Sequence, residues 1–267
     1  MLGLHPFSRQ AVRLGIAVGS LAAAAACGDN TINGPTLDAN LSRIAGFDPL
    51  KAALVKARKE ANGGFNLDMW AAVVDRNGLV VAVVFTGATS TDQWPGSRVI
   101  AAQKANTANA FSLPHLALSS ANLYAATQPG GTLFGLQEAN PTNEDVAYGG
   151  NADDYGTRKD FMVGKRIGGT NVFGGGVPLY DADGTLVGGL GVSGDASCAD
   201  HNIAWKMRHN LELDYVPGGV ADGGKDDNII YDFDANGVSA SGFGHPKCSD
   251  AATAIGNALP TTHPIGH

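Results

Sequence analysis

The chain has 267 residues, of which 44% are hydrophobic, 16% are charged and 37 are glycine. This composition is typical of a globular protein with enough apolar residues for one sizeable core. The formal charge of −7 disfavours non-specific binding to nucleic acid or to an anionic membrane surface, so we expect neither as a partner.

The first 27 residues have the features of an export signal. Arg9 and Arg13 precede an apolar run, residues 16–26, that is too short to cross a bilayer. Small residues lead to Cys27, which resembles an imperfect bacterial lipoprotein cleavage site. We predict an exported protein of the periplasm or cell envelope, lipid-anchored at Cys27, with simple export as the alternative. Residues 28–46 are then expected to form a flexible tether.

Export also bears on the two remaining cysteines, Cys198 and Cys248. An oxidising compartment favours their pairing, and two cysteines allow a single connectivity. We predict a disulfide between them that joins the C-terminal segment to the loop after residue 193. Two free thiols are the alternative.

A helix and a hairpin are predicted first. Residues 47–62 carry apolar residues at helical spacing, with Asp48 as the expected N-cap. Strands at residues 67–74 and 79–85 flank a turn that contains Asn-Gly, a strong hairpin signal. The near-continuous valines of the second strand indicate burial on both faces.

Residues 97–111 predict a second helix that Ser97 caps. Lys104 and Thr107 are three residues apart in it and therefore share a face. From spacing alone they are either part of a site or an ordinary surface pair. A short helix is expected at residues 119–127.

Residues 174–195 predict a second hairpin, with apolar runs on both sides of a glycine-containing turn. Its outgoing strand is interrupted by Gly188, Gly189 and Gly191. Glycine weakens a strand, so its presence here indicates close approach by another backbone or by a ligand. Tight packing of a helix on the sheet and a ligand site therefore both remain open.

A helix should follow, starting from Ser197 or Asp200 and running to about residue 213. His201 and His209 share one face of it, which allows a two-histidine metal site. No third carboxylate or thiolate stands at ligand spacing, so helix-cap and surface roles are the alternative.

The tail carries a partial calcium-binding pattern. Asp232, Asp234 and Asn236 match the first half of such a loop, but Phe243 replaces the closing carboxylate. A calcium site and a plain turn are both possible. We expect the last residues, which include two prolines, to be disordered.

Four blocks of the chain resemble the GlcG/HbpS family of haem-binding-like proteins, also called DUF336. They are the hairpin at 67–88, the helix at 97–111, the hairpin at 174–195 and the helix start at 200–204, in the family's order. The resemblance implies an α/β (α+β) profilin-like fold: an antiparallel sheet of two hairpins flanked by helices, over residues 47–214. Residues 112–173 then contain an insertion, which is either a lid, a subunit contact or a solvated loop, and residues 215–267 form a C-terminal extension.

The same resemblance implies a function. Family members bind haem non-covalently, often between subunits, and some are linked to haem degradation or redox sensing. It therefore predicts an exported, homo-oligomeric haem-binding protein, whose ligand is bordered by the helix at 97–111, by the loop before it at 86–96 and by residues 129–136. The implied contacts are Arg98, Lys104, Thr107, Gly189 and Gly191, with Arg166 as a further partner for the propionates. His115 is the preferred axial or metal ligand, and the alternatives are His201, His209, His245, Met162, Met207 and Tyr155.

The sequence has no Gly-x-Ser-x-Gly elbow, P-loop, dinucleotide fingerprint or Cys-x-x-Cys-His haem-attachment motif. Whether the protein is an enzyme stays open. One alternative is a small-molecule enzyme that acts on a hydroxy acid or related carboxylate, bound by Lys104 or Arg98 and by backbone N–H groups of residues 188–194. A non-catalytic sensory or scaffold module is the other.

Overall fold

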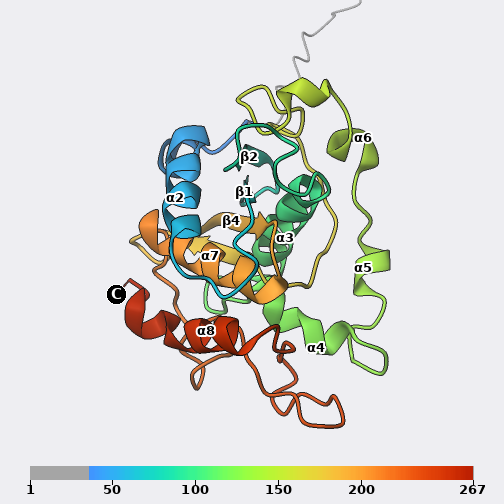
Figure 1. The fold of residues 1–267 in the computed structure, drawn as a ribbon, viewed down its shortest axis with the longest axis vertical. Coiled ribbons are helices and arrows are strands. Elements are labelled where there is room, and N and C mark those ends of the chain that lie inside the picture. The colour runs from blue at the N-terminus through green and yellow to red at the C-terminus, as the bar shows by residue number, and fades with distance from the viewer. Residues whose placement is uncertain (1–35, 267) are drawn as a thin grey trace, which may run out of the picture. The chain divides into compact units, whose positions relative to one another are not determined.

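The computed structural model describes residues 36–266, whose centre is a four-stranded antiparallel sheet in the order β2-β1-β4-β3 (Figure 1). One hairpin consists of β1 (Trp70–Asp75) and β2 (Val80–Phe85), and the other of β3 (Gly176–Tyr180) and β4 (Leu186–Ser193). The hairpins join where β1 pairs with β4. The predicted sheet of two hairpins is confirmed.

Helices cover both faces of this sheet (Figure 1). α2 (Phe47–Lys59) and α7 (Ser197–Asn210) pack on one face, and α3 (Ser97–Phe111) packs on the other. Every residue of β1 and all but the last of β2 are therefore buried. This explains why β2 reads as a run of valines and does not alternate with polar residues.

Helix α3 lies directly on β4 because β4 has no side chains at the contact. A β-carbon on Gly189 would collide with the carbonyl oxygen of Ala105, and one on Gly191 with that of Ala101. Of the two explanations for these glycines, tight packing of a helix on the sheet is therefore the correct one for both. The expectation that they contact a ligand is corrected, because the α3 backbone occupies the space above them.

The predicted helix caps were wrong in three helices. The residues before α2, α3 and α7 are Gly46, Gly96 and Ala196, and none of them makes a side-chain cap. Partners from distant elements take three of the expected caps: Asp48 contacts Arg158, Ser197 contacts His245, and Asp200 contacts Lys104. Long-range polar contacts thus replaced local capping.

Residues 112–173 are partly packed and contain several short helices. Ala147, Met162 and Ile167 are buried in one cluster with Trp70 and the apolar face of α3. This part of the predicted insertion completes the core on the α3 side and is not merely a solvated loop. The helices are η1 (Ser120–Leu123), α4 (Tyr124–Thr127), α5 (Leu136–Ala139), α6 (Glu144–Ala147) and η2 (Ala152–Asp154). The first two confirm the helix expected at 119–127.

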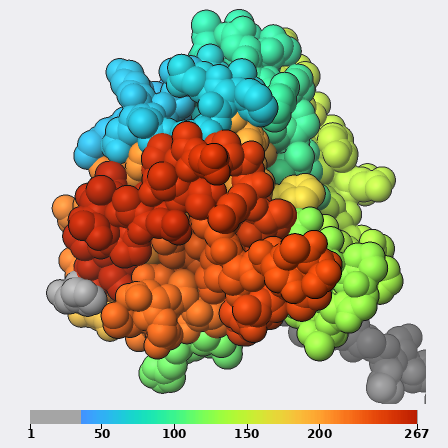
Figure 2. Space-filling view, turned by 60° about the horizontal axis from the view of Figure 1, so that its bottom comes forward, coloured from blue at the N-terminus to red at the C-terminus, as the bar shows by residue number. Residues whose placement is uncertain are grey.

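The C-terminal residues return across the molecule, and in Figure 2 they cover much of the face in view, coloured orange to red. α8 (Asp250–Thr262) packs against α7, and the indole Nε1 of Trp205 donates to the carbonyl of His263 at 2.8 Å. The predicted terminal disorder is therefore wrong for α8. The helix continues through Pro260, and its neighbour Leu259 is fully buried.

The predicted signal segment, the lipidation at Cys27 and the first part of the tether lie outside the described residues. The rest of the expected tether holds a helix, α1 (Ala39–Ala45), which Asp38 caps by accepting from the N–H of Leu41 at 2.7 Å. Leu41 and Ala45 belong to the core, so the tether prediction is wrong there. Within residues 36–266, no helix is long and apolar enough to cross a membrane.

Candidate functional site

A small cavity of about 140 Å³ lies where β4 ends and α3 and α7 begin. Charged and hydroxyl groups line its inner part, and two aromatic side chains stand at its rim. The inner residues are Lys104, Ser193, Asp195, Ser197 and Asp200, and the rim residues are Trp94 and Phe173. The described residues form larger hollows elsewhere, but this one contains a buried ionisable residue from each of the two helices, Lys104 of α3 and Asp200 of α7.

Lys104 and Asp200 form a buried ion pair in this cavity. The Nζ of Lys104 lies 2.7 Å from Oδ2 of Asp200 and also donates to the carbonyl of Val192 at 3.1 Å. The other carboxylate oxygen of Asp200 accepts from the N–H of Asp195 at 2.9 Å. Burial raises the pKa of Asp200, and the neighbouring ammonium group partly offsets this effect. The ammonium group has three protons, so one remains for a further acceptor.

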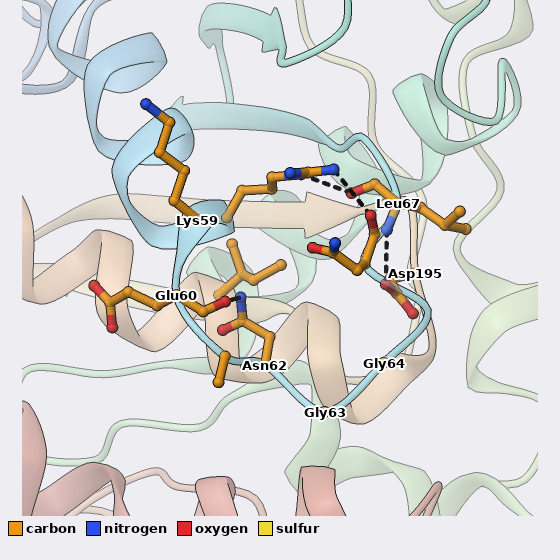
Figure 3. Close-up of a pocket in the computed structure, with 11 residues that line it drawn as sticks. Lys59, Glu60, Asn62, Gly63, Gly64, Leu67 and Asp195 are labelled. Atoms are coloured by element: carbon orange, nitrogen blue, oxygen red, sulfur yellow. Dashed lines mark hydrogen bonds between the residues drawn. The ribbon is translucent and has the colours of Figure 1, made fainter.

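Asp195 connects this cavity with a larger polar one of about 340 Å³, which is drawn in Figure 3. Its carboxylate accepts from the backbone N–H groups of Phe65 at 2.8 Å and Leu67 at 3.2 Å. In Figure 3 it points to the loop that carries Gly63 and Gly64. Since these bonds hold the loop between α2 and β1, Asp195 has a structural role and is not available to a ligand.

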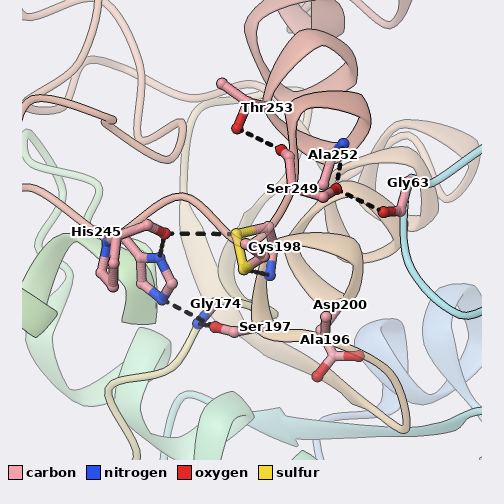
Figure 4. Close-up of a disulfide and its surroundings, with 12 residues drawn as sticks. Gly63, Gly174, Ala196, Ser197, Cys198, Asp200, His245, Ser249, Ala252 and Thr253 are labelled. Atoms are coloured by element: carbon pink, nitrogen blue, oxygen red, sulfur yellow. Dashed lines mark hydrogen bonds between the residues drawn. A yellow bond between two sulfur atoms is a disulfide. The ribbon is translucent and has the colours of Figure 1, made fainter.

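The side chain of Ser197 contacts a residue of the C-terminal extension (Figure 4). Its Oγ lies 2.9 Å from Nε2 of His245 and accepts from the N–H of Gly174 at 2.7 Å. His245 is buried, and its Nδ1 lies 2.7 Å from the carbonyl of Pro246. Burial lowers the pKa of His245 to about 4, so the ring is neutral at pH 7.

The predicted disulfide is present next to this contact and joins Cys198 to Cys248. Cys198 follows Ser197 at the start of α7, and Cys248 is three residues beyond His245. The bridge therefore holds the extension against the cavity. Together with His245 these sulfur atoms are the three metal-type donors that lie close together within residues 36–266, but the disulfide occupies both sulfurs.

The cavity rim is apolar and accessible. The side chains of Trp94 and Phe173 are 53% and 46% exposed, although both are large and hydrophobic. Trp94 precedes α3 and Phe173 precedes β3, so two separate loops supply the rim. Exposed aromatic groups beside a polar cavity are typical of ligand sites.

Of the residues that the family resemblance implied, the structure brings Lys104 to the cavity. Arg98 is buried in a bidentate pair with Asp160, and its guanidinium lies 3.6 Å from the ring centre of Tyr155. Thr107 bonds the backbone of Gln103 and of Asn171. These contacts engage Arg98, Thr107 and Tyr155 inside the protein, away from the cavity.

The predicted metal or axial histidines do not come together. His115 is exposed in the turn that follows the far end of α3. His201 is fully buried, with Nε2 3.2 Å from Oδ1 of Asn228. His209 bonds Asp214 through Nδ1 at 2.8 Å. A shared metal site for these histidines is therefore a wrong prediction, because the two in α7 each bond a separate partner.

The remaining candidates also lie elsewhere. Met162 and Met207 are buried in opposite cores, and Arg166 is exposed and donates to the carbonyl of Asn77. Residues 129–136 were expected on the ligand side, but those at 129–132 instead border a hollow with residues from the segment 233–242.

The predicted calcium loop is a plain turn. The carboxylate of Asp234 accepts from the backbone of Asn236 and Val238, both at 2.9 Å. Asp232 accepts from the hydroxyl of Ser239 at 2.7 Å. Because the loop's own N–H and O–H groups use these oxygens, calcium binding is not supported.

Sequence reasoning expected the loop that carries Trp94 beside the ligand, but it missed Phe173 and assigned Ser197 and Asp200 only to capping. A usable signal was present, since the predicted disulfide joins the neighbours of Ser197 and His245. Phe173 had no such signal, because it lies in a loop of the predicted insertion.

The sheet of two hairpins, with helices on both faces and a small polar cavity at the end of its glycine-rich strand, defines an α+β domain of the profilin-like type. The chain belongs to the HbpS-like family, whose model is described as haem degrading protein HbpS-like and matches residues 48–208. The family resemblance predicted from the sequence is confirmed. Two residues described above lie beyond the matched residues. They are His245, which contacts Ser197, and Cys248, which forms the disulfide with Cys198.

A comparison with curated protein sequences found no match. Solved structures with a similar fold include protein ORFY of Klebsiella pneumoniae, at 22% identity over 63% of this chain and 88% of that chain, with a TM-score of 0.43. Another is PduOC in complex with haem, at 24% identity over 62% and 93%, with a TM-score of 0.41. A double mutant of Streptomyces reticuli HbpS has 23% identity over 71% and 97%, with a TM-score of 0.37.

Proposed function

We propose that this protein binds haem non-covalently and acts in haem handling or redox sensing. The observation that carries the proposal is the match of the haem degrading HbpS-like family over residues 48–208. One of the similar solved structures is PduOC in complex with haem. These two similarities do not identify the residues that contact haem. The cavity between α3 and α7 is the proposed location.

The aromatic side chains at the cavity rim would hold the haem macrocycle. The cavity, at about 140 Å³, is smaller than the roughly 300–1,000 Å³ of ordinary ligand pockets, so it cannot enclose a tetrapyrrole. The exposed rings of Trp94 and Phe173 offer an apolar surface of the right kind. Lys104 offers a proton to one propionate.

His115 of a second copy of the chain is the residue that we infer would hold the haem iron. His245 at the cavity is buried and bonded to Ser197, whereas His115 is exposed at the far end of α3. The exposed imidazole of His115 would reach haem on the rim of another protomer. This arrangement agrees with the homo-oligomer that the family resemblance implies.

An absorbance titration of the purified protein with hemin tests this function. We expect a Soret band at micromolar hemin that His115→Ala shifts and that Trp94→Ala and Phe173→Ala weaken at least tenfold. Phe134→Ala, which removes an aromatic ring 67% exposed elsewhere, is the control. Light scattering with and without hemin measures the assembly. Absence of a Soret change at micromolar hemin would contradict the proposal.

A second candidate is a small hydroxy acid or related carboxylate inside the cavity. The cavity volume favours it, since about 140 Å³ suits a few heavy atoms, and Lys104 has a proton to donate. A thermal-shift screen with such acids tests it, and Lys104→Met should abolish any shift. A protein that binds neither hemin nor these acids fits the sensory or scaffold module.

We further propose export and lipid anchoring at Cys27. The pattern of residues 1–27 supports it, and so does the Cys198–Cys248 disulfide, because such bridges persist in oxidising compartments. The protein should fractionate with membranes, and Cys27→Ser should release it. A protein found in the cytoplasm with both cysteines reduced would contradict export.

A further inference from the structure

We propose that Ser197 and His245 are a nucleophile and its general base, and that they transfer the acyl group of small carboxylic esters to water. This activity goes beyond haem binding and does not depend on it. Ser197 lies within the residues that the family model matches and His245 lies outside them, so the C-terminal extension of this chain supplies one member of the pair.

The hydrogen bonds fix the direction of proton transfer. Nδ1 of His245 lies 2.7 Å from the carbonyl of Pro246, and since a carbonyl only accepts, Nδ1 carries the proton. Nε2 of the neutral ring is then unprotonated and accepts from the hydroxyl of Ser197 at 2.9 Å. A serine that donates to an imidazole held by a third group is the arrangement of an activated nucleophile.

The base is held rigidly. The ring of Tyr124 packs against the imidazole of His245, with ring centres 5.0 Å apart. The disulfide from Cys198 to Cys248 holds both chain segments together (Figure 4). A fixed base supports catalysis, because the reacting groups need no reorganisation.

Hydrogen-bond donors for an oxyanion lie at the start of α7 and in the cavity. α7 begins at Ser197, and the N–H groups in the first turn of a helix have no partner within the helix. Among them, the N–H of Cys198 already donates to Sγ of Cys248 at 3.1 Å, which leaves those of Ser197 and Ala199. The N-cap residue Ala196 adds no side-chain cap. Lys104 lines the same cavity and has one proton beyond those given to Asp200 and Val192. Such preorganised donors stabilise a tetrahedral intermediate.

The reaction proceeds in two displacements. Oγ of Ser197 attacks the ester carbonyl carbon as its proton passes to Nε2 of His245, and the carbonyl π electrons move onto oxygen. Collapse breaks the bond to the alcohol, which takes the proton from His245 and leaves an acyl-serine. Water then attacks this acyl group and gives a proton to His245, and collapse returns that proton to Ser197 and releases the carboxylic acid.

The cavity also selects the substrate. At about 140 Å³ it accommodates a short acyl chain and excludes a long one. The aromatic rim of Trp94 and Phe173 would contact the alcohol part, which favours an apolar or aromatic leaving group. We therefore expect an acetyl ester to react faster than an octanoyl ester of the same alcohol.

The test uses the purified, haem-free protein with a fluorophosphonate probe and with p-nitrophenyl acetate and octanoate. We expect the probe to label Ser197, as located by mass spectrometry, and acetate to be the better substrate. Ser197→Ala and His245→Gln should each lower kcat/KM for acetate about 100-fold or more. Ser90→Ala, in the loop before α3, is the serine control.

Circular dichroism and thermal unfolding show whether each variant is folded. If Ser197→Ala does not fold, two other results decide the question. They are probe labelling of the unaltered protein at Ser197 and the lower kcat/KM of the His245→Gln variant. Labelling at another residue, or no labelling and no hydrolysis, overturns the proposal. A Soret band with hemin is measured separately, so either proposal can fail without the other.

Discussion

The Nζ of Lys104 lies 2.7 Å from Oδ2 of Asp200, and this pair joins helices that cover opposite faces of the sheet. The contact passes the end of β4, where Lys104 also bonds the carbonyl of Val192. Both side chains are at most 3% exposed. The cavity therefore forms where one buried ion pair joins two layers of the fold.

Removing one partner of this pair should destabilise the protein strongly. Lys104→Met leaves the buried carboxylate of Asp200 unpaired, which costs about 3–5 kcal/mol in the free energy of unfolding. Adding Asp200→Leu should recover part of this loss, because the double variant buries no charge. Urea unfolding measures both. Lys225→Met, at an exposed ion pair, is the control and should leave the midpoint nearly unchanged. Additive losses in the double variant would contradict the coupling.

The close approach of α3 to β4 should make Gly191 intolerant of a side chain. Gly191→Ala places a methyl group against the carbonyl oxygen of Ala101, so we expect a loss of about 1–3 kcal/mol in the free energy of unfolding. Gly96→Ala is a matched control, because nothing lies within 4 Å of its added β-carbon. Equal urea midpoints for the two variants would show that α3 does not pack here.

The disulfide should stabilise the fold and position His245. It closes a separation of 50 residues, for which the chain-entropy model gives about 4 kcal/mol. Replacing both Cys198 and Cys248 by serine should lower the unfolding free energy by this order. It should also lower the ester hydrolysis rate, since the segment that carries His245 is less constrained. Unfolding with and without a dithiol reductant provides the comparison, and an unchanged hydrolysis rate would count against the positioning role.

The protein should become less stable as the pH is lowered, because His201 is buried in its neutral form. Burial lowers its pKa to about 4, whereas the ordinary value is about 6.5. Between these values the unfolded chain binds more protons, so the free energy of unfolding falls as pH falls from 6.5 to 4, by up to about 1.4 kcal/mol per pH unit for this group. His201→Gln should make the pH dependence shallower than in the unaltered protein. Urea unfolding at several pH values measures it, with the exposed His115→Gln as the matched control. A slope unchanged by His201→Gln would refute this assignment.

Much of the fold could be predicted because its signals are local. The Asn-Gly turn and the valine run predict the first hairpin, and the turn after Tyr180 predicts the second. The pairing of Cys198 with Cys248 followed from counting once Cys27 was assigned to the export segment. The helix caps could not be predicted in this way, because Ser197 and Asp200 satisfy partners 48 and 96 residues distant.

By itself, the sequence determined the family, the two hairpins and the identity of the disulfide partners, since these depend on local periodicity and on residue counts. Only the tertiary structure decided that Gly189 and Gly191 receive a helix and that His245 meets Ser197. The glycine pattern is equally compatible with a helix and with a ligand. Glycines show that no side chain stands at these positions of the strand, but they do not show which group packs there. What fills that space is decided by packing between segments far apart in the chain, which no local pattern encodes.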